Sequence, residues 1–266
     1  MILPRRVLPK GLPSSRGTLA PRPGRAQLDL MIGEADSVIY GSVVYGEWVE
    51  RMNRFLARVR VDGQVERVHV KNTGRLRELF VPGRTVALEA ADRSGRRTRY
   101  SVIAVRAGKQ WVNVDSQAPN RVVSEALMAG QLAEFGTASG VTREVRYGQS
   151  RFDISYESPR ARGFIEVKGV TLVADGVAKF PDAPTDRGTR HIYELVDAVR
   201  NGYEGTVFFL IQRQDARAFA PNREMDAKFA EALEFAARHG VRVLAYGCRV
   251  EADRLQLGDP VPVQLT

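Results

Sequence analysis

The segment that most constrains the fold of this chain is a nearly uninterrupted apolar run, Gly205 to Gln212. A membrane-spanning helix needs about 20 apolar residues, so this run is too short to cross a bilayer. A strand that is apolar on both faces is expected in a sheet covered by helices on both sides. Helical apolar spacing occurs before it, from His191 to Arg200, and after it, from Met225 to Ala236, where Gly240 ends the pattern.

The rest of the second half follows the same plan. A helix is predicted from Asn120 to Leu132, three strands follow it, and a last main strand runs from Val241 to Val250. The order is helix, three strands, helix, strand, helix, strand, which predicts an α/β domain with a central mixed sheet over residues 118–266. The three strands are predicted at Glu144 to Tyr147, Arg151 to Tyr156 and Phe164 to Val173.

The first half, residues 37–117, reads as a series of short strands instead. Asp62-Gly63 is a strong hairpin signal, and Ser94-Gly95 marks a second turn. One or two turns of helix are predicted at residues 75–79, between the third and fourth strands. This arrangement predicts a small closed barrel such as an OB-fold, with a generic β-sandwich as the alternative.

Residues 1–36 differ from both halves because prolines alternate with arginines and no hydrophobic periodicity is present. No apolar stretch follows the first basic residues, so the segment does not resemble a signal peptide. We interpret it as a disordered basic arm or an over-extended start with Met31 as the true first residue. The alternative is an arm that contacts phosphate.

The charge balance favours polyanionic partners. The chain of 266 residues carries 40 Lys and Arg against 31 Asp and Glu, a net charge of +9. Such a surplus attracts phosphates, so nucleic acid is an expected partner. A membrane is not expected, because the longest apolar runs are too short for a membrane helix. Cys248 is the only cysteine, which excludes an internal disulfide and a cysteine-rich zinc site and fits a reducing, cytoplasmic setting.

The strand Phe164 to Lys168 carries the candidate chemistry. Because side chains alternate between faces, Ile165 and Val167 should enter a core while Glu166 and Lys168 share the opposite face, about 7 Å apart. Asp153 lies on the preceding strand and can meet Glu166 if the two strands pair. Two carboxylates suit Mg²⁺ or Mn²⁺, which would activate a water for attack on phosphate while Lys168 orients it.

The alternative interpretation of this triplet is a solvated strand face with a cross-strand ion pair. The apolar surroundings, the glycine at 169 and the order of helices and strands, which a nuclease core requires, favour the catalytic interpretation. Further carboxylate ligands are considered at Glu125, on the predicted helix, and at Asp182. For Glu125 an ordinary exposed helix acid is the equal alternative.

The segment Phe180 to Gly188 precedes the predicted helix and is a candidate phosphate pocket. Thr185 or Asp186 could cap the helix, leaving free N–H groups beside Arg187 and Arg190. A rigid proline-rich turn with a capped helix is the plain alternative. The three histidines are scattered, without metal-ligand spacing, although His191 could face phosphate.

Several motifs in the same order resemble the bacterial and archaeal sugar fermentation stimulation protein family, over residues 38–264. The resemblance implies an N-terminal OB-fold domain and a C-terminal PD-(D/E)XK nuclease-like domain. It also implies DNA binding linked to regulation of sugar (maltose) metabolism genes, together with DNA/RNA nuclease activity. Asp153, Glu166 and Lys168 match the catalytic motif, whereas Asp186 stands where the family more often has Glu. The motifs are Asn72-Thr73-Gly74-Arg75-Leu76, Val112 to Ser116, Glu144-Val145, Tyr147-Gly148, Ser150-Arg151, Glu166 to Leu172 and Phe180 to Thr185 with Arg187-Gly188.

These observations predict a DNA-binding protein with a metal-dependent nuclease site, with RNA as the alternative nucleic acid. The competing hypothesis is a regulator that binds DNA on a nuclease-like scaffold without cleaving it, and a blander one is a structural adaptor. The sequence leaves the oligomeric state open, a homodimer included. The predicted nucleic-acid contacts are Arg151, Arg187, Arg190, Lys71 and Arg75.

Overall fold

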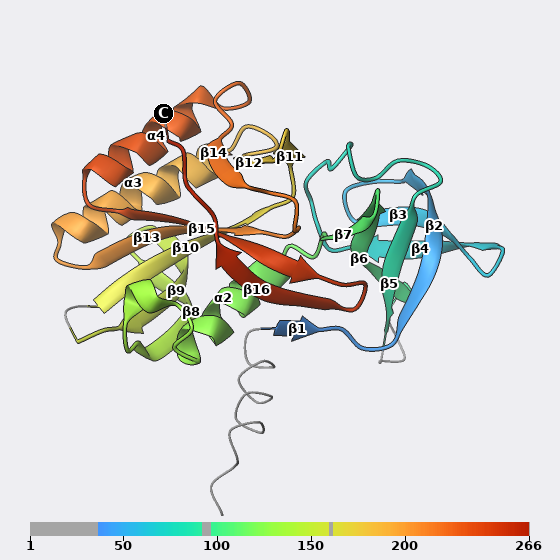
Figure 1. Ribbon diagram of the computed structural model, residues 1–266, viewed down its shortest axis with the longest axis horizontal. Coiled ribbons are helices and arrows are strands. Elements are labelled where there is room, and N and C mark those ends of the chain that lie inside the picture. Colours follow the sequence, from blue (N-terminus) through green and yellow to red (C-terminus); the bar gives the residue numbers. More distant parts are fainter. Residues whose placement is uncertain (1–36, 92–96, 160–161, 266) are drawn as a thin grey trace, which may run out of the picture.

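The computed structural model describes residues 37–91, 97–159 and 162–265. The predicted basic arm and the Ser94-Gly95 turn therefore lie outside the described residues. Figure 1 shows a small barrel of strands beside a larger domain in which helices cover a central sheet. This mixed α+β architecture is the one that the sequence predicts.

The smaller body is a closed barrel. Strand β2 pairs with both β3 and β5, and the parallel pairing of β4 with β6 closes the ring, while β7 extends the sheet beyond β6. Closure agrees with an OB-like barrel and not with an open sandwich. The strands are β2 (Val43–Arg51), β3 (Leu56–Val61), β4 (Gln64–Val70), β5 (Thr85–Ala90), β6 (Tyr100–Ala107) and β7 (Gln110–Asn113).

Alternation builds the barrel core, and a turn closes one end of it. In β3 the residues Ala57, Val59 and Val61 are buried while those between them are exposed. The helix predicted at residues 75–79 is wrong: Leu76 has a φ of 44°, outside the helical region, and its carbonyl accepts from the N–H groups of Leu79 and Phe80 in a turn.

The larger domain has a seven-stranded mixed sheet in the order β1-β16-β15-β13-β10-β9-β8. Strands β10, β13 and β15 are parallel, and the outer pairs are antiparallel. Strands β11, β12 and β14 form a small second sheet. The strands are β1 (Ser37–Ile39), β8 (Ser139–Tyr147), β9 (Ser150–Glu157), β10 (Arg162–Val170), β11 (Val173–Ala174), β12 (Val177–Phe180), β13 (Glu204–Ile211), β14 (Ala218–Pro221), β15 (Arg242–Val250) and β16 (Arg254–Pro260).

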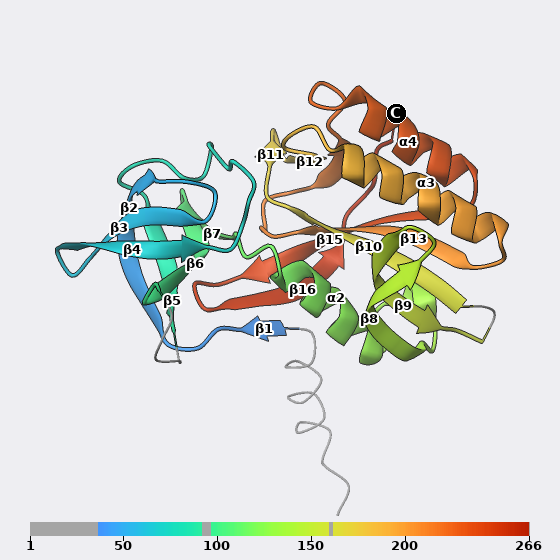
Figure 2. The same cartoon turned by 180° about the vertical axis from the view of Figure 1, so that it is seen from behind.

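Helices cover both faces of this sheet (Figures 1 and 2). Helix α2 (Ala118–Met128) lies below it, a short 3₁₀ turn η1 (Ala133–Phe135) follows, and α3 (Asp186–Arg200) and α4 (Ala227–Arg238) lie above. In β13, Phe208 and Leu210 join the core on the α2 side. The alternating residues Val207, Phe209 and Ile211 join the core on the α3 side. This two-sided burial explains the apolar run and confirms the predicted helix-covered sheet.

The first strand departs from the prediction. Residues 37–39 were assigned to the barrel, but β1 pairs with β16 in the larger domain, and β16 itself was not expected as a main strand. Three residues carry no usable periodicity, so their partner is decided by packing between distant segments.

The barrel and the larger domain share one hydrophobic core. Ala87, Ile103 and Ala104 of the barrel pack in the cluster that contains the buried face of α2. Gln212, at the end of β13, donates from Nε2 to the Asn113 side chain at 2.8 Å and to the Asp115 carbonyl at 3.1 Å. Within the residues that the structure describes, every helix is too short or too polar to span a bilayer.

Candidate metal and phosphate site

The site lies where β10 approaches its carboxyl end. Ile165 and Val167 pack into the core on the α2 side, as alternation predicts. Glu166 contacts His191 of α3, so it faces the other side of the sheet. A Cβ added at Gly169 would lie 2.5 Å from the Gln212 side-chain oxygen, so only glycine fits there. The close approach expected at Gly169 is present, and its neighbour is Gln212.

Asp153 enters the site where β9 separates from β10. The pairing of these strands ends at Ile154 and Ile165, and beyond it the Asp153 carboxylate accepts from the Val167 N–H at 2.8 Å. Its other oxygen accepts from the Asn120 side chain of α2 at 2.7 Å. The Asp153 carboxylate thus accepts the Val167 N–H in place of a backbone carbonyl of β9. This bond holds Asp153 beside Glu166, as predicted. Phe152 and Ile154 belong to different core clusters, so β9 twists across this point.

Glu166 is almost completely buried, with 2% of its surface exposed. One oxygen, Oε1, lies 2.5 Å from Lys168 Nζ and 2.6 Å from His191 Nδ1. The other, Oε2, is buried and has no hydrogen-bond partner among the described residues. A buried oxygen of this kind costs free energy when nothing binds it.

The two carboxyl groups have opposite pKa shifts. Burial raises the pKa of Asp153, and the negative charge of Glu166 raises it further. Burial alone would also raise the pKa of Glu166, but Lys168 and His191 together outweigh burial and hold it below its usual value. The site therefore favours the ionised form of Glu166 and disfavours a second negative charge on Asp153 beside it.

The sequence pattern did not predict that His191 supports Glu166. His191 is buried, its Nδ1 contacts Glu166, and its Nε2 accepts from Arg187 Nε at 3.5 Å. These contacts agree with the tautomer that carries the proton on Nδ1 and donates it to the carboxylate. One signal was available: His191 precedes Leu195 by four residues and so lies on the buried stripe of α3.

The two additional carboxylates are not brought to the site. Glu125 accepts from Arg121 on the outer side of α2 at 2.7 Å. Asp182 lies near the barrel, where a Cβ added at Gly74 would be 3.0 Å from its carboxylate. Within the described parts of the chain, no three His, Cys, Asp or Glu side chains gather around one metal position. The possible third acidic ligand, Glu125 or Asp182, therefore stays a prediction that these contacts do not support.

The predicted nucleic-acid contacts fall into two groups. Arg75, Arg151, Arg187 and Arg190 are exposed, although Arg151 lies 3.4 Å from Glu144. Lys71, in contrast, is largely buried and pairs with both Glu89 and Asp115. The prediction for Lys71 is wrong because its alkyl chain and charge are used at the junction of the two bodies.

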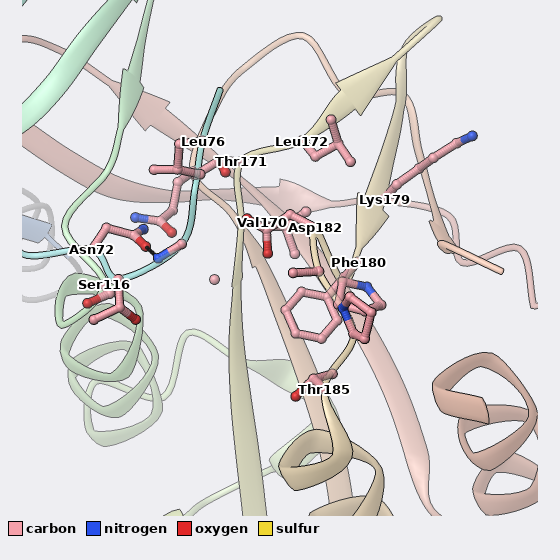
Figure 3. A pocket seen from close by; sticks show the side chains of 17 residues that line it. Asn72, Leu76, Ser116, Val170, Thr171, Leu172, Lys179, Phe180, Asp182 and Thr185 are labelled. Carbon is pink, nitrogen blue, oxygen red and sulfur yellow. Dashed lines mark hydrogen bonds between the residues drawn. The ribbon is translucent and has the colours of Figure 1, made fainter. Parts of the chain in front are cut away.

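A cleft of about 320 Å³ lies between the barrel and the segments that follow β10 and β12 (Figure 3). Asn72 and Ser116 line one side, and Phe180, Asp182 and Thr185 line the other. Thr185 caps α3, its hydroxyl accepting from the Gly188 N–H, as predicted. The N-terminus of α3 and the residues after Lys168 thus border the same space.

Comparison with known proteins agrees with this architecture. The family model described as the sugar fermentation stimulation protein RE domain matches residues 117–254, and the SfsA N-terminal OB domain matches residues 49–114. The chain belongs to the sugar fermentation stimulation protein family. The two matched segments correspond to the larger domain and the barrel.

Members of this family align over nearly their whole length. A sugar fermentation stimulation protein homolog of Alkaliphilus oremlandii (strain OhILAs) is 47% identical over 229 residues, covering 84% of this chain and 97% of the relative. A homolog of Desulfitobacterium hafniense (strain Y51) is 46% identical over 226 residues, covering 85% and 98%. A solved structure, Pyrococcus furiosus SfsA in complex with Ca²⁺, has a TM-score of 0.79 and 28% identity, and covers 85% of this chain and 98% of that one.

Proposed function

We propose that this protein is a divalent-metal-dependent phosphodiesterase that binds and cleaves nucleic acid. The observation that carries the proposal is the buried, unpartnered Oε2 of Glu166 beside Asp153. Mg²⁺ is commonly held by one or two carboxylates and completes its shell with water and substrate phosphate. Two protein carboxylates without a third fit that pattern, with Mn²⁺ as a substitute. The Ca²⁺ of the archaeal relative supports a hard-cation site in the family.

A bound ion of this kind lowers the pKa of a coordinated water and offsets negative charge on a phosphoryl group. The residues of the chain prepare that chemistry. Lys168 and His191 orient Glu166 through its Oε1 and leave Oε2 available. The Val167 N–H and Asn120 fix the Asp153 carboxylate. Two carboxyl groups are thereby held ready in a buried position, where a cation gains more from a negative charge than it would in water.

Lys168 acts on the phosphate or the attacking water in the proposed reaction. Its ammonium group lies 2.5 Å from Glu166 Oε1, and 15% of its side chain is exposed. There it can donate to a phosphate oxygen or orient the attacking water as negative charge develops. The exposed Arg75, Arg151, Arg187 and Arg190 are the proposed phosphate contacts around it, and the net charge of +9 favours such a polyanion.

The experiment is cleavage of labelled DNA and RNA oligonucleotides with Mg²⁺ or Mn²⁺ by wild type, Asp153→Asn and Lys168→Ala. We expect metal-dependent products from wild type and a loss of about 100-fold or more in both variants. Equal activity in all three proteins would place the activity elsewhere. Binding that weakens steeply with salt, without cleavage of any substrate, would favour a non-catalytic nucleic-acid-binding regulator instead.

A further inference from the structure

The loop between β2 and β3 carries an exposed aromatic side chain. Phe55 is 47% exposed and Met52 is 41% exposed. The Arg54 guanidinium carbon lies 5.1 Å from the centre of the Phe55 ring, a cation–π arrangement. An aromatic ring beside arginine is the combination on which unpaired nucleobases stack.

The loop holds Phe55 in place. The side-chain oxygen of Asn53 accepts from the N–H groups of Phe55 and Leu56 at 2.9 and 3.0 Å. The Phe55 carbonyl accepts from the Val70 N–H at 2.8 Å, which ties the loop to the end of β4. These bonds fix the loop backbone, so less backbone freedom is lost there when a ligand binds.

Arg51 connects this loop to the wall of the cleft. Its guanidinium donates to the carbonyl of Arg54 at 2.9 Å and to that of Asn72 at 2.6 Å, and it also contacts the Gly74 carbonyl. Asn72 and Gly74 line the cleft, whose opposite wall includes Gly169, the residue after Lys168. The loop that carries Phe55 is therefore hydrogen-bonded to one wall of the cleft, and Gly169, the residue after Lys168, lines the same cleft.

Exposed arginines lie in this loop and beside it. Arg54 is in the loop, and Arg75, whose carbonyl accepts from Arg51 at 3.1 Å, is also exposed. On the adjoining strands, Arg58 and Arg67 lie directly opposite each other in the β3–β4 register. Like charges in this position repel each other, so Glu50, 2.6 Å from Arg58, offsets only part of the cost. A polyanion would relieve the rest.

We infer that Phe55 and its arginine neighbours form a single-strand platform, which leads an unpaired segment of nucleic acid through the cleft to Lys168. The inference rests on the proposed function and deepens it by naming the substrate class. A base stacks on Phe55 while phosphates contact Arg54 and Arg75. A duplex cannot use the platform in this way because its bases are already stacked on one another.

The test measures fluorescence anisotropy of a fluorescein-labelled oligothymidylate of about 12 nucleotides, a length within the range that an OB fold covers, in EDTA so that no cleavage occurs. For Phe55→Ala we expect affinity about 5- to 150-fold weaker than wild type, and near-wild-type affinity for Phe55→Trp. The matched control is Tyr45→Ala, since Tyr45 is 58% exposed on the same barrel but stacks on Trp111. Its affinity should stay within about twofold of wild type.

The single-strand platform would be overturned if wild type did not bind the oligonucleotide, if Phe55→Ala bound like wild type, or if Tyr45→Ala lost as much affinity. A duplex of the same length whose binding fell equally in Phe55→Ala would overturn the single-strand assignment. Because binding is read without metal, loss of binding in Phe55→Ala alongside a wild type that cleaves nothing with Mn²⁺ would refute cleavage alone. Cleavage by wild type with no effect of Phe55 would refute the platform alone.

Discussion

Two buried charged clusters in this molecule differ in how completely their polar atoms are paired. At the junction of barrel and larger domain, Lys71 binds Glu89 at 3.0 Å and Asp115 at 2.9 Å. Asp115 also accepts from the Gln117 N–H and the Tyr40 hydroxyl, so both its oxygens are used. At the end of β10, Glu166 has one oxygen in two contacts, and its other oxygen has no partner among the described residues.

The difference separates a structural role from a ligand-binding role. A buried ion pair whose hydrogen bonds are satisfied can be kept for the geometry it imposes. Here that geometry is the fixed arrangement of the barrel against the larger domain. An unsatisfied buried carboxylate oxygen is unfavourable in the isolated protein, so its retention points to a partner that arrives later. The following predictions test this contrast, from the largest expected effect to the smallest.

The largest expected effect is the loss of activity in Glu166→Gln. It keeps the size of the side chain but removes the charge that would attract the cation, so metal-dependent cleavage should fall by about 1,000-fold. The measurement is the initial rate with Mn²⁺ on a labelled oligonucleotide, with the unfolding midpoint as the check on folding. A variant that retained wild-type rates would remove Glu166 from the site.

Lys71→Met should act on stability instead. It leaves Asp115 and Glu89 without their cation, and the free energy of unfolding should fall by about 3 kcal/mol in urea denaturation. Cleavage per folded molecule should remain, since Lys71 does not reach the site. The matched control is Arg60→Met, whose exposed pair with Glu47 should contribute less than about 1 kcal/mol. Equal losses in the two variants would contradict a structural role for the junction cluster.

His191→Ala should weaken Mn²⁺ binding by about 10- to 100-fold, as expected for a residue that orients a metal ligand. The effect is read by titration calorimetry. His191→Asn, which can keep a donor near the position of Nδ1, should recover part of the affinity. His239→Asn serves as the control because His239 is exposed and stacks on Phe235. Unchanged binding in His191→Ala would mean that Glu166 does not need the imidazole.

The smallest effect is a pH dependence in the metal-free protein. The pKa of Asp153 is higher in the folded state than in the unfolded chain, where it is about 3.9. Ionisation therefore costs stability, and the cost grows as pH rises from the unfolded pKa through the folded one, then stays constant. Relative to wild type, Asp153→Asn should gain unfolding free energy over that window in EDTA. A difference that was flat or shrank with rising pH would contradict the raised pKa.

Local pattern was enough to place much of the fold and part of the site. The apolar run at β13 predicted a helix-covered sheet, and alternation in β10 placed Glu166 and Lys168 on the face opposite Ile165 and Val167. The hairpin at Asp62-Gly63 and the Thr185 cap follow from turn and capping chemistry in the same way. These are properties of a few consecutive residues, whose geometry depends little on the rest of the chain.

Contacts between distant segments could be learned only from the folded chain. No spacing rule links His191 to Glu166, Asn120 to Asp153 or β1 to β16. The same is true of Lys71, an ordinary cation in the sequence that folding buries between two acids, and of Phe55, an apolar residue that folding leaves outside. Which partner a side chain meets depends on how helices and sheets pack over long chain separations. Residue types and spacing can therefore suggest a cation site, but packing decides which polar atoms stay unpaired.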